Sequence, residues 1–217
     1  GGGHTEELVG QVIRDFDRSK LFIASKVWHT NLHSGEVIQA CARSLERLGT
    51  DYLDLYLIHW PDDDTPLEET FHGLNDLLEQ GAVRRLGVSN FSLQQLQHAE
   101  QLAARPLATN QVPYSLTNRE YVENGVVDYC KQNGILVTAY TPVEKGKLAN
   151  HPELQSIARA HGATPIQVAL AWLVQQENVI TIPQSTNLEH LRLNLEAADL
   201  DLSAEEMERL NGVVETV

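Results

Sequence analysis

The chain has 217 residues, with 16 Lys and Arg residues against 30 Asp and Glu residues, and its formal net charge of −14 excludes the basic surface that binding to nucleic acid requires. Its hydrophobic content of 42% is enough for a large core, because roughly 70% of the unfolded surface is buried at this chain length. No apolar run approaches the roughly 18 residues of a membrane span, and no signal-like segment opens the chain, so we expect no membrane partner.

Short apolar stretches rich in β-branched residues recur along the chain, as is typical of strands buried on both faces. They lie at 21–27, 53–58, 83–88, 107–112, 135–140 and 179–182. Segments with the spacing of amphipathic helices lie at 6–14, 36–48, 67–78, 93–102, 121–131, 152–161, 164–176 and 188–198. We expect Thr5 to cap the first helix and Asn187 the last. The alternation predicts an α/β fold with a parallel sheet and right-handed crossovers.

Two architectures satisfy this alternation, an open doubly wound sheet and a TIM (β/α)8 barrel. The open sheet would carry a G-x-G-x-x-G turn after its first strand, and no strand precedes the only glycine cluster, at 1–3. The barrel is therefore favoured. Only six of its eight strands are present, so we expect roughly 45–60 further N-terminal residues, with the first two strands, to precede this chain. The alternative is a misfolded, oligomeric or inactive fragment.

No linker, repeat or low-complexity tract interrupts the chain, and residues 1–217 are predicted to form a single domain. Cys41 and Cys130 fall on helical segments, where a buried thiol is the usual state, so we expect a reducing compartment and a cytoplasmic protein. The nine histidines are scattered along the chain and no Cys-x-x-Cys pair accompanies them, and we predict no metal site.

Polar side chains end every predicted strand, and in a barrel the reactive groups lie at the carboxyl ends of the strands. Lys26 is either a solvated lysine or, if partly buried, a group that tunes a neighbouring acid. His59 is either a hydrogen-bonded core histidine or a neutral imidazole that orients a carbonyl oxygen. Its neighbour Trp60 would add an apolar wall.

Other strand ends carry groups suited to a flat, polar ligand. Asn90 and Gln111 could hold a planar carboxamide by its donor and acceptor edges, and Tyr140 could stack on a ring. Gln184 and Ser185 precede the helix at 188–198, whose backbone N–H groups could bind a phosphate. The alternative for this last segment is an ordinary turn between strand and helix.

Several of these residues stand in motifs that together are highly specific. Lys26 lies in Ile-Ala-Ser-Lys-Val-Trp and His59 in Asp-Leu-Tyr-Leu-Ile-His-Trp-Pro, and Gly-Val-Ser-Asn-Phe, Asn-Gln and Ile-Pro-Gln-Ser follow at 87–91, 110–111 and 182–185. Over nearly its whole length the chain resembles the aldo-keto reductases. The resemblance implies a (β/α)8 barrel that binds a nicotinamide dinucleotide across its C-terminal rim and passes a hydride between the nicotinamide and a carbonyl or alcohol carbon.

The resemblance also implies a role for each matching residue. Lys26 would lower the pKa of the catalytic tyrosine, and His59 would position the carbonyl. The catalytic tyrosine and the aspartate that pairs with the lysine are expected in the segment preceding this chain. The cofactor-binding residues would be Ser89, Asn90, Gln111, Tyr140, Thr141, Gln184, Ser185, His190 and Asn194. Trp28 and Trp60 would line the substrate pocket.

The cofactor expected from the resemblance is NADPH, with NADH as an alternative. Many members place a lysine and an arginine against the 2′-phosphate of NADP, where this chain has Gln184 and His190, although Ser185, Thr186 and Arg192 could bind it. We therefore predict a monomeric NADPH-dependent oxidoreductase that reduces an aldehyde or ketone to an alcohol. The alternatives are a regulatory subunit that binds the cofactor without turnover, and a barrel isomerase or aldolase with Lys26 as a Schiff base.

Overall fold

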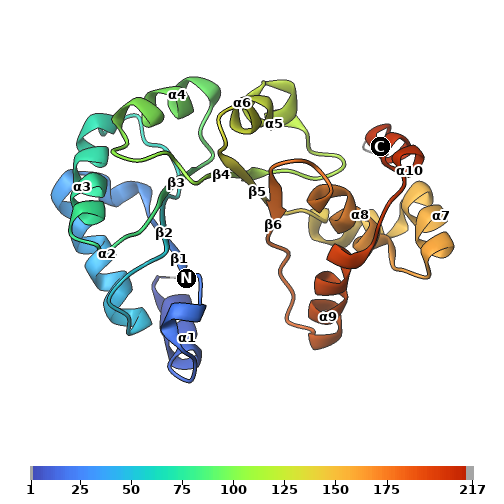
Figure 1. Cartoon of the computed structure of the whole chain (residues 1–217), viewed down its shortest axis with the longest axis horizontal. Helices are drawn as coiled ribbons and strands as arrows, with labels where there is room; N and C mark the ends of the chain where they lie inside the picture. Colours follow the sequence, from blue (N-terminus) through green and yellow to red (C-terminus); the bar gives the residue numbers. More distant parts are fainter. Residues whose placement is uncertain (1, 214–217) are drawn as a thin grey trace. The chain divides into compact units, whose positions relative to one another are not determined.

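The computed structural model describes residues 2–213 and divides the chain into two compact units, Gly1–Asn110 and Gln111–Val217. Six strands are hydrogen-bonded in chain order, from β1 to β6, and helices alternate with them along the sequence (Figure 1). The predicted α/β class and all six predicted strands are confirmed.

The first unit contains three paired parallel strands. Their bounds are β1 Ala24–Val27, β2 Leu55–Ile58 and β3 Leu86–Ser89. Lys26 lies beside Leu57, and Leu57 beside Gly87, so these three positions share one face of the sheet. A Cβ on Gly87 would lie 2.9 Å from Thr109 Cγ2, which explains the glycine at this position of the strand.

Helices cover the other face of these strands. They are α1 His4–Ile13, α2 Ser34–Leu48, α3 Leu67–Glu79 and α4 Leu93–Leu102, with short 3-10 turns η1 Arg18–Lys20 and η2 His29–Asn31. Helices α2 and α3 lie side by side (Figure 1). Between them and the strands the core includes fully buried Tyr56, Ile58, Phe71 and Leu74.

Strand β1 begins three residues later than predicted, because side chains of an arginine and an aspartate form hydrogen bonds with the backbone of the preceding residues. Arg18 donates to the Leu21 carbonyl at 2.8 Å, and Asp54 accepts from the Ile23 amide at 2.9 Å. Arg18 also donates to Asp54 at 2.8 Å. Arg18 and Arg84 both stack on the ring of Tyr52, with their guanidinium carbons 3.9 and 3.7 Å from the ring centroid.

The second unit begins within β4, Thr109–Pro113, and contains the parallel pair of β5, Leu136–Tyr140, and β6, Val179–Thr181. Its helices are α5 Glu120–Glu123, α6 Val126–Gln132, η3 Glu144–Asn150, α7 Pro152–His161, α8 Pro165–Val174, α9 Leu188–Glu196, η4 Ala197–Asp199 and α10 Ala204–Asn211. Helix α8 is the most buried of them, and its Trp172 donates to the Asn211 side chain in α10 at 2.9 Å.

Two helix predictions are wrong in detail. The residue at the N-cap of α1 is Gly3, not Thr5, which lies inside the helix. The helix predicted at 121–131 is broken at Gly125, whose φ of 81° interrupts the helical backbone. Helix α10 was not predicted. Both cysteines are buried as expected, and among residues 2–213 no helix is long and apolar enough to cross a membrane.

Candidate active site

Lys26 and His59 lie on the same face of the sheet in the first unit. Lys26 is beside Leu57 in the register, and side chains alternate between faces with a period of two, so His59 follows Leu57 on that face. Ser89 follows Gly87 on it in the same way. The His59 amide donates to the Val27 carbonyl at 3.0 Å, which extends the ladder to the histidine.

Burial and charge act together on these two groups. Both side chains are partly buried. Burial lowers the pKa of Lys26. Burial also lowers the pKa of His59, and the positive charge of Lys26 lowers it further. His59 is therefore a neutral imidazole near pH 7, and it lies close enough to Lys26 to feel its charge.

An indole packs against the ring of the histidine. The ring centroids of Trp28 and His59 are 4.9 Å apart with an angle of 87° between the planes, an edge-to-face contact. His29 lies 4.9 Å from the same indole, a contact that the sequence analysis did not anticipate. Trp28 is 47% exposed and Trp60 is 42% exposed, so both offer apolar surface to a ligand.

Asn90 follows β3 in a left-handed conformation, with φ of 64°. Its side-chain amide donates to the His59 carbonyl at 3.1 Å and to Ser89 Oγ at 3.0 Å. Asn110 donates to the carbonyl of Phe91 at 3.1 Å and so supports the same turn from β4. A non-glycine residue with positive φ is uncommon and concentrates at functional sites, which favours a ligand-binding role for this turn.

In the second unit, Gln111, Tyr140 and Thr141 are placed by β4 and β5. Tyr140 is the last residue of β5 and is partly buried; burial raises the pKa of its hydroxyl, and Glu120 acts in the same direction. Its carbonyl accepts from the amide of Tyr114, the residue directly after β4, at 3.3 Å. Thr141 is exposed and has a positive φ of 53°, so the chain turns sharply directly after the tyrosine.

The remaining predicted residues lie in the segment before α9 and on the helix itself. Asn187 caps this helix, as predicted, by accepting from the amides of Glu189 and His190. Gln184 and His190 are exposed, whereas Ser185 and Asn194 are partly exposed. Arg192 is held by Glu189 at 2.6 Å and by Glu196, so two carboxylates compensate its charge.

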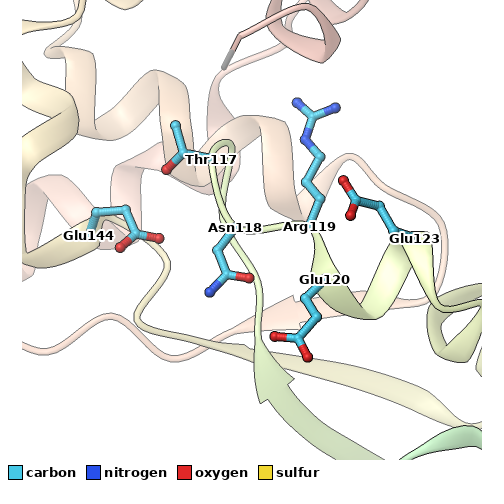
Figure 2. A pocket seen from close by; sticks show the side chains of 6 residues that line it. All are labelled: Thr117, Asn118, Arg119, Glu120, Glu123 and Glu144. Atoms are coloured by element: carbon cyan, nitrogen blue, oxygen red, sulfur yellow. The ribbon is translucent and has the colours of Figure 1, made fainter. Parts of the chain in front are cut away.

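A separate polar pocket of about 300 Å³ lies in the second unit (Figure 2). It is lined by Thr117, Asn118, Arg119, Glu120, Glu123 and Glu144. Figure 2 shows Arg119 and Glu120 pointing in opposite directions. The Arg119 guanidinium donates to the carbonyls of Leu116, Leu210 and Asn211. This pocket contains none of the predicted site residues, and its arginine connects segments of the chain.

Comparison with known proteins shows which family the chain belongs to. The aldo/keto reductase family profile matches residues 1–215. The chain is 40% identical over 209 residues to the methylglyoxal reductase DkgB of Yersinia pestis, covering 93% of this chain and 76% of that protein. The chain belongs to the aldo/keto reductase family.

Solved structures of other aldo-keto reductases agree with this assignment. The thermostable aldo-keto reductase Tm1743, crystallised with the inhibitor epalrestat, is 44% identical with a TM-score of 0.95, over 97% of this chain and 78% of that one. An aldo/keto reductase from Klebsiella pneumoniae, solved with NADP and acetate, is 38% identical with a TM-score of 0.89, over 96% and 75%. The fold is therefore the predicted TIM barrel, and this aldo/keto reductase is an oxidoreductase that interconverts carbonyls and alcohols.

Proposed function

We propose that this aldo/keto reductase uses NADPH to reduce small aldehydes such as methylglyoxal, with His59 and Lys26 as its catalytic residues. The observation that carries the proposal is the shared face of Lys26 and His59, with a neutral imidazole held edge-on against Trp28. The names of the similar methylglyoxal reductases support the substrate class.

His59 is suited to orient the carbonyl oxygen of the substrate. Because its pKa is lowered by burial and by Lys26, the imidazole is neutral and has one N–H to donate. Its backbone is bound on both sides, since its amide donates to Val27 and its carbonyl accepts from Asn90. A donor fixed in this way needs little reorganisation when charge develops on the oxygen.

Lys26 is suited to favour negative charge on the same oxygen and to tune the acid that protonates it. Its ammonium is partly buried, and opposite charges attract more strongly where water is excluded. The pKa of a lysine also shifts readily on burial. This role predicts that removal of the Lys26 charge lowers turnover more than it weakens substrate binding.

The residues at the strand ends fit a nicotinamide dinucleotide. We propose that Asn90 and Gln111 bind the carboxamide and that Tyr140 stacks on the nicotinamide ring. Tyr140 ends β5 as a partly buried ring next to the sharp turn at Thr141. Ser89 supports Asn90 by accepting from its amide. When bound, NADPH supplies the hydride that reduces the carbonyl carbon.

The adenosine end of the cofactor is assigned to the start of α9. Residues Gln184, Ser185, His190 and Asn194 are proposed to contact it, near the amide-rich N-terminus of the helix. Arg192 is paired with two glutamates, so its contact with a 2′-phosphate would compete with them. We therefore propose NADPH as the cofactor with appreciable use of NADH. A preference in kcat/KM for NADH above roughly tenfold, about 1.4 kcal/mol, would contradict this assignment.

The proposed function is tested by NADPH consumption with methylglyoxal. Wild-type protein and the control H98Q, at a surface His–Glu pair, should turn over equally, whereas H59Q and K26M should lose at least about a hundredfold in kcat/KM. Tight binding of NADPH without turnover by any aldehyde would instead indicate a regulatory subunit. Trapping of a substrate on Lys26 by borohydride would indicate Schiff-base chemistry.

The proposal also includes the domain organisation, the oligomeric state and the cellular location predicted from the sequence. We propose that residues 1–217 belong to one barrel domain, and that the enzyme is a monomer in the cytoplasm. The two buried thiols support a reducing compartment. Light scattering of the purified protein tests the monomer, and a dimer at micromolar concentration would contradict it.

A further inference from the structure

We propose that Glu6 is a positioning residue for Lys26, and that it acts by binding strand β1 to helices α1 and α2 through Ser25 and Arg47. The role rests on the function proposed for Lys26, since a positioning residue matters only if the lysine does. Glu6 itself does not touch the substrate side of the sheet.

The carboxylate of Glu6 is the centre of a compact network. Its Oε1 accepts from the Ser25 hydroxyl at 2.5 Å, and its Oε2 accepts from Arg47 Nε at 2.6 Å and lies 2.5 Å from Arg47 Nη2. Arg47 also donates to Ser44 Oγ at 3.4 Å. One side chain of α1 is thereby bound to both β1 and α2.

The position of Ser25 in the strand connects this network to the lysine. Ser25 precedes Lys26 directly and points to the opposite, helix-covered face, beside Tyr56. A hydrogen bond at Ser25 therefore fixes the strand one residue away from the functional amine. Strand β1 has only four residues, and the bond from Ser25 adds a side-chain contact to its backbone pairing with β2.

Helix α1 is held at the distance that this network requires. A Cβ on Gly10 would lie 2.5 Å from the Arg47 carbonyl and 2.9 Å from the Leu48 carbonyl, so the absence of a side chain lets α1 approach the end of α2. A Cβ on Gly3 would lie 2.6 Å from Arg47 Nε. Arg47 thus lies against Gly3 at the N-cap of α1, Gly10 within the helix and the carboxylate of Glu6.

The charge of Glu6 is maintained although the side chain is only 18% exposed. Burial alone would raise its pKa, but hydrogen bonds from Ser25, Ser44 and Arg47 and the charge of Arg47 lower it overall. The carboxylate is therefore ionised throughout the neutral range. Removing one partner of such an enclosed ion pair leaves the charge of the other uncompensated. The strand and helices that the pair connects then lose this contact.

The decisive variants are S25A and E6Q. S25A removes only the link to β1 and leaves the pair of Glu6 and Arg47 intact, whereas S25T keeps a hydroxyl and should restore the wild-type behaviour. The matched control is E206Q, because Glu206 is similarly enclosed, at 15% exposed, and has His161 as its partner at 2.8 Å in the second unit. Thermal unfolding of each variant confirms that it is folded at the temperature of measurement.

The first readout is the titration of Lys26, followed by NMR of the protein with ¹³C-methylated lysines and assigned with K26R. In S25A and E6Q the amine of Lys26 should become more exposed to water, so its pKa should rise toward the ordinary value. In S25T and E206Q the pKa of Lys26 should match that of the wild type. An unchanged Lys26 titration in both S25A and E6Q would overturn the proposal. An equal rise in E206Q would also overturn it, because the effect would then be a general loss of stability.

The second readout is turnover of methylglyoxal with NADPH. S25A should lower kcat about tenfold with little change in KM, because a displaced catalytic group costs turnover before it costs binding. If the wild type is active and S25A has the same kcat, the positioning role is contradicted. If the wild type itself shows no turnover, the proposed function fails, and the titration of Lys26 still decides whether Glu6 positions it.

Discussion

The imidazole of His59 meets the indole of Trp28 edge to face, with the ring centroids 4.9 Å apart and the planes at 87°. The contact restrains the orientation of the histidine ring, while the backbone hydrogen bonds with Val27 and Asn90 restrain its main chain. The ring contact and the backbone hydrogen bonds together hold the histidine in place. Trp28 remains 47% exposed, so the same indole can contact a substrate.

Truncation of Trp28 should therefore impair the histidine as well as the pocket. An aromatic pair of this kind is worth about 1 kcal/mol, and W28A should lower kcat/KM for methylglyoxal about fivefold. W28F, which keeps an aromatic ring, should lose less. Steady-state kinetics of the two variants checks this, and equal values for W28A and the wild type would show that the ring contact has no catalytic role.

Gly10 should be intolerant of even a methyl group. A Cβ at this position would lie 2.5 Å from the Arg47 carbonyl, which belongs to the backbone and has little room to move. G10A should lower the free energy of unfolding by about 2 kcal/mol. The control is G35A in α2, where a Cβ meets nothing within 4 Å, and this variant should be neutral or stabilised by about 0.5 kcal/mol. Urea denaturation measures both, and equal effects would refute the close approach.

The hydroxyl of Tyr56 is a buried group that costs stability. It is fully buried, and it has no hydrogen-bond partner among the described residues. Y56F should leave the free energy of unfolding unchanged or raise it by up to about 1 kcal/mol, since no hydrogen bond is lost. The matched control is T70V: the Thr70 hydroxyl donates to the Leu32 carbonyl at 2.8 Å, and its removal should cost about 1–3 kcal/mol. A large destabilisation by Y56F would reveal an interaction of its hydroxyl.

Asp54 should make stability depend on pH in the acidic range. Burial would raise its pKa, but hydrogen bonds from Ile23 and Arg18 and the charges of Arg18 and Arg84 lower it overall, below the ordinary value of 3.8. The folded state therefore binds the proton less readily than the unfolded state. The stability that Asp54 contributes is fully present above about pH 5 and is lost as the pH falls through 3.8 toward the lower folded value.

The variant D54N tests this directly. At pH 7 it should be less stable than the wild type by at least about 2 kcal/mol, because the side chain is enclosed and its arginine partners lose their counter-charge. The difference between the two proteins should shrink as the pH is lowered to about 3. A difference that stays constant from pH 7 to pH 3 would contradict a depressed pKa at Asp54.

Much of the fold and of the candidate site was predictable because local sequence patterns determine them. Buried strands are continuous apolar runs, so all six were found, and the polar residue that ends each run marks its carboxyl end, as Lys26 and His59 show. The parallel register of β1 and β2 then places these two side chains on one face of the sheet.

The parts that were missed depend on contacts between distant residues or on signals that were overlooked. The network of Glu6, Ser25 and Arg47 joins residues up to 41 positions apart, and no local pattern announces it. Nor does a local pattern show that Asp54 and Arg18 delay the start of β1. Helix α10, in contrast, has a capping box formed by Ser203 and Glu206, which a closer analysis of its sequence would have found.

The pKa of His59 is the most direct test of the central claim, that Lys26 and His59 act from one face of the sheet. NMR titration of labelled histidines, with the His59 signal assigned by H59Q, compares the wild type with K26M and with K20M at an exposed lysine. K26M should raise the His59 pKa, because the charge of Lys26 lowers it, and K20M should leave it unchanged. An identical His59 titration in the wild type and K26M would show that the two side chains do not share a site.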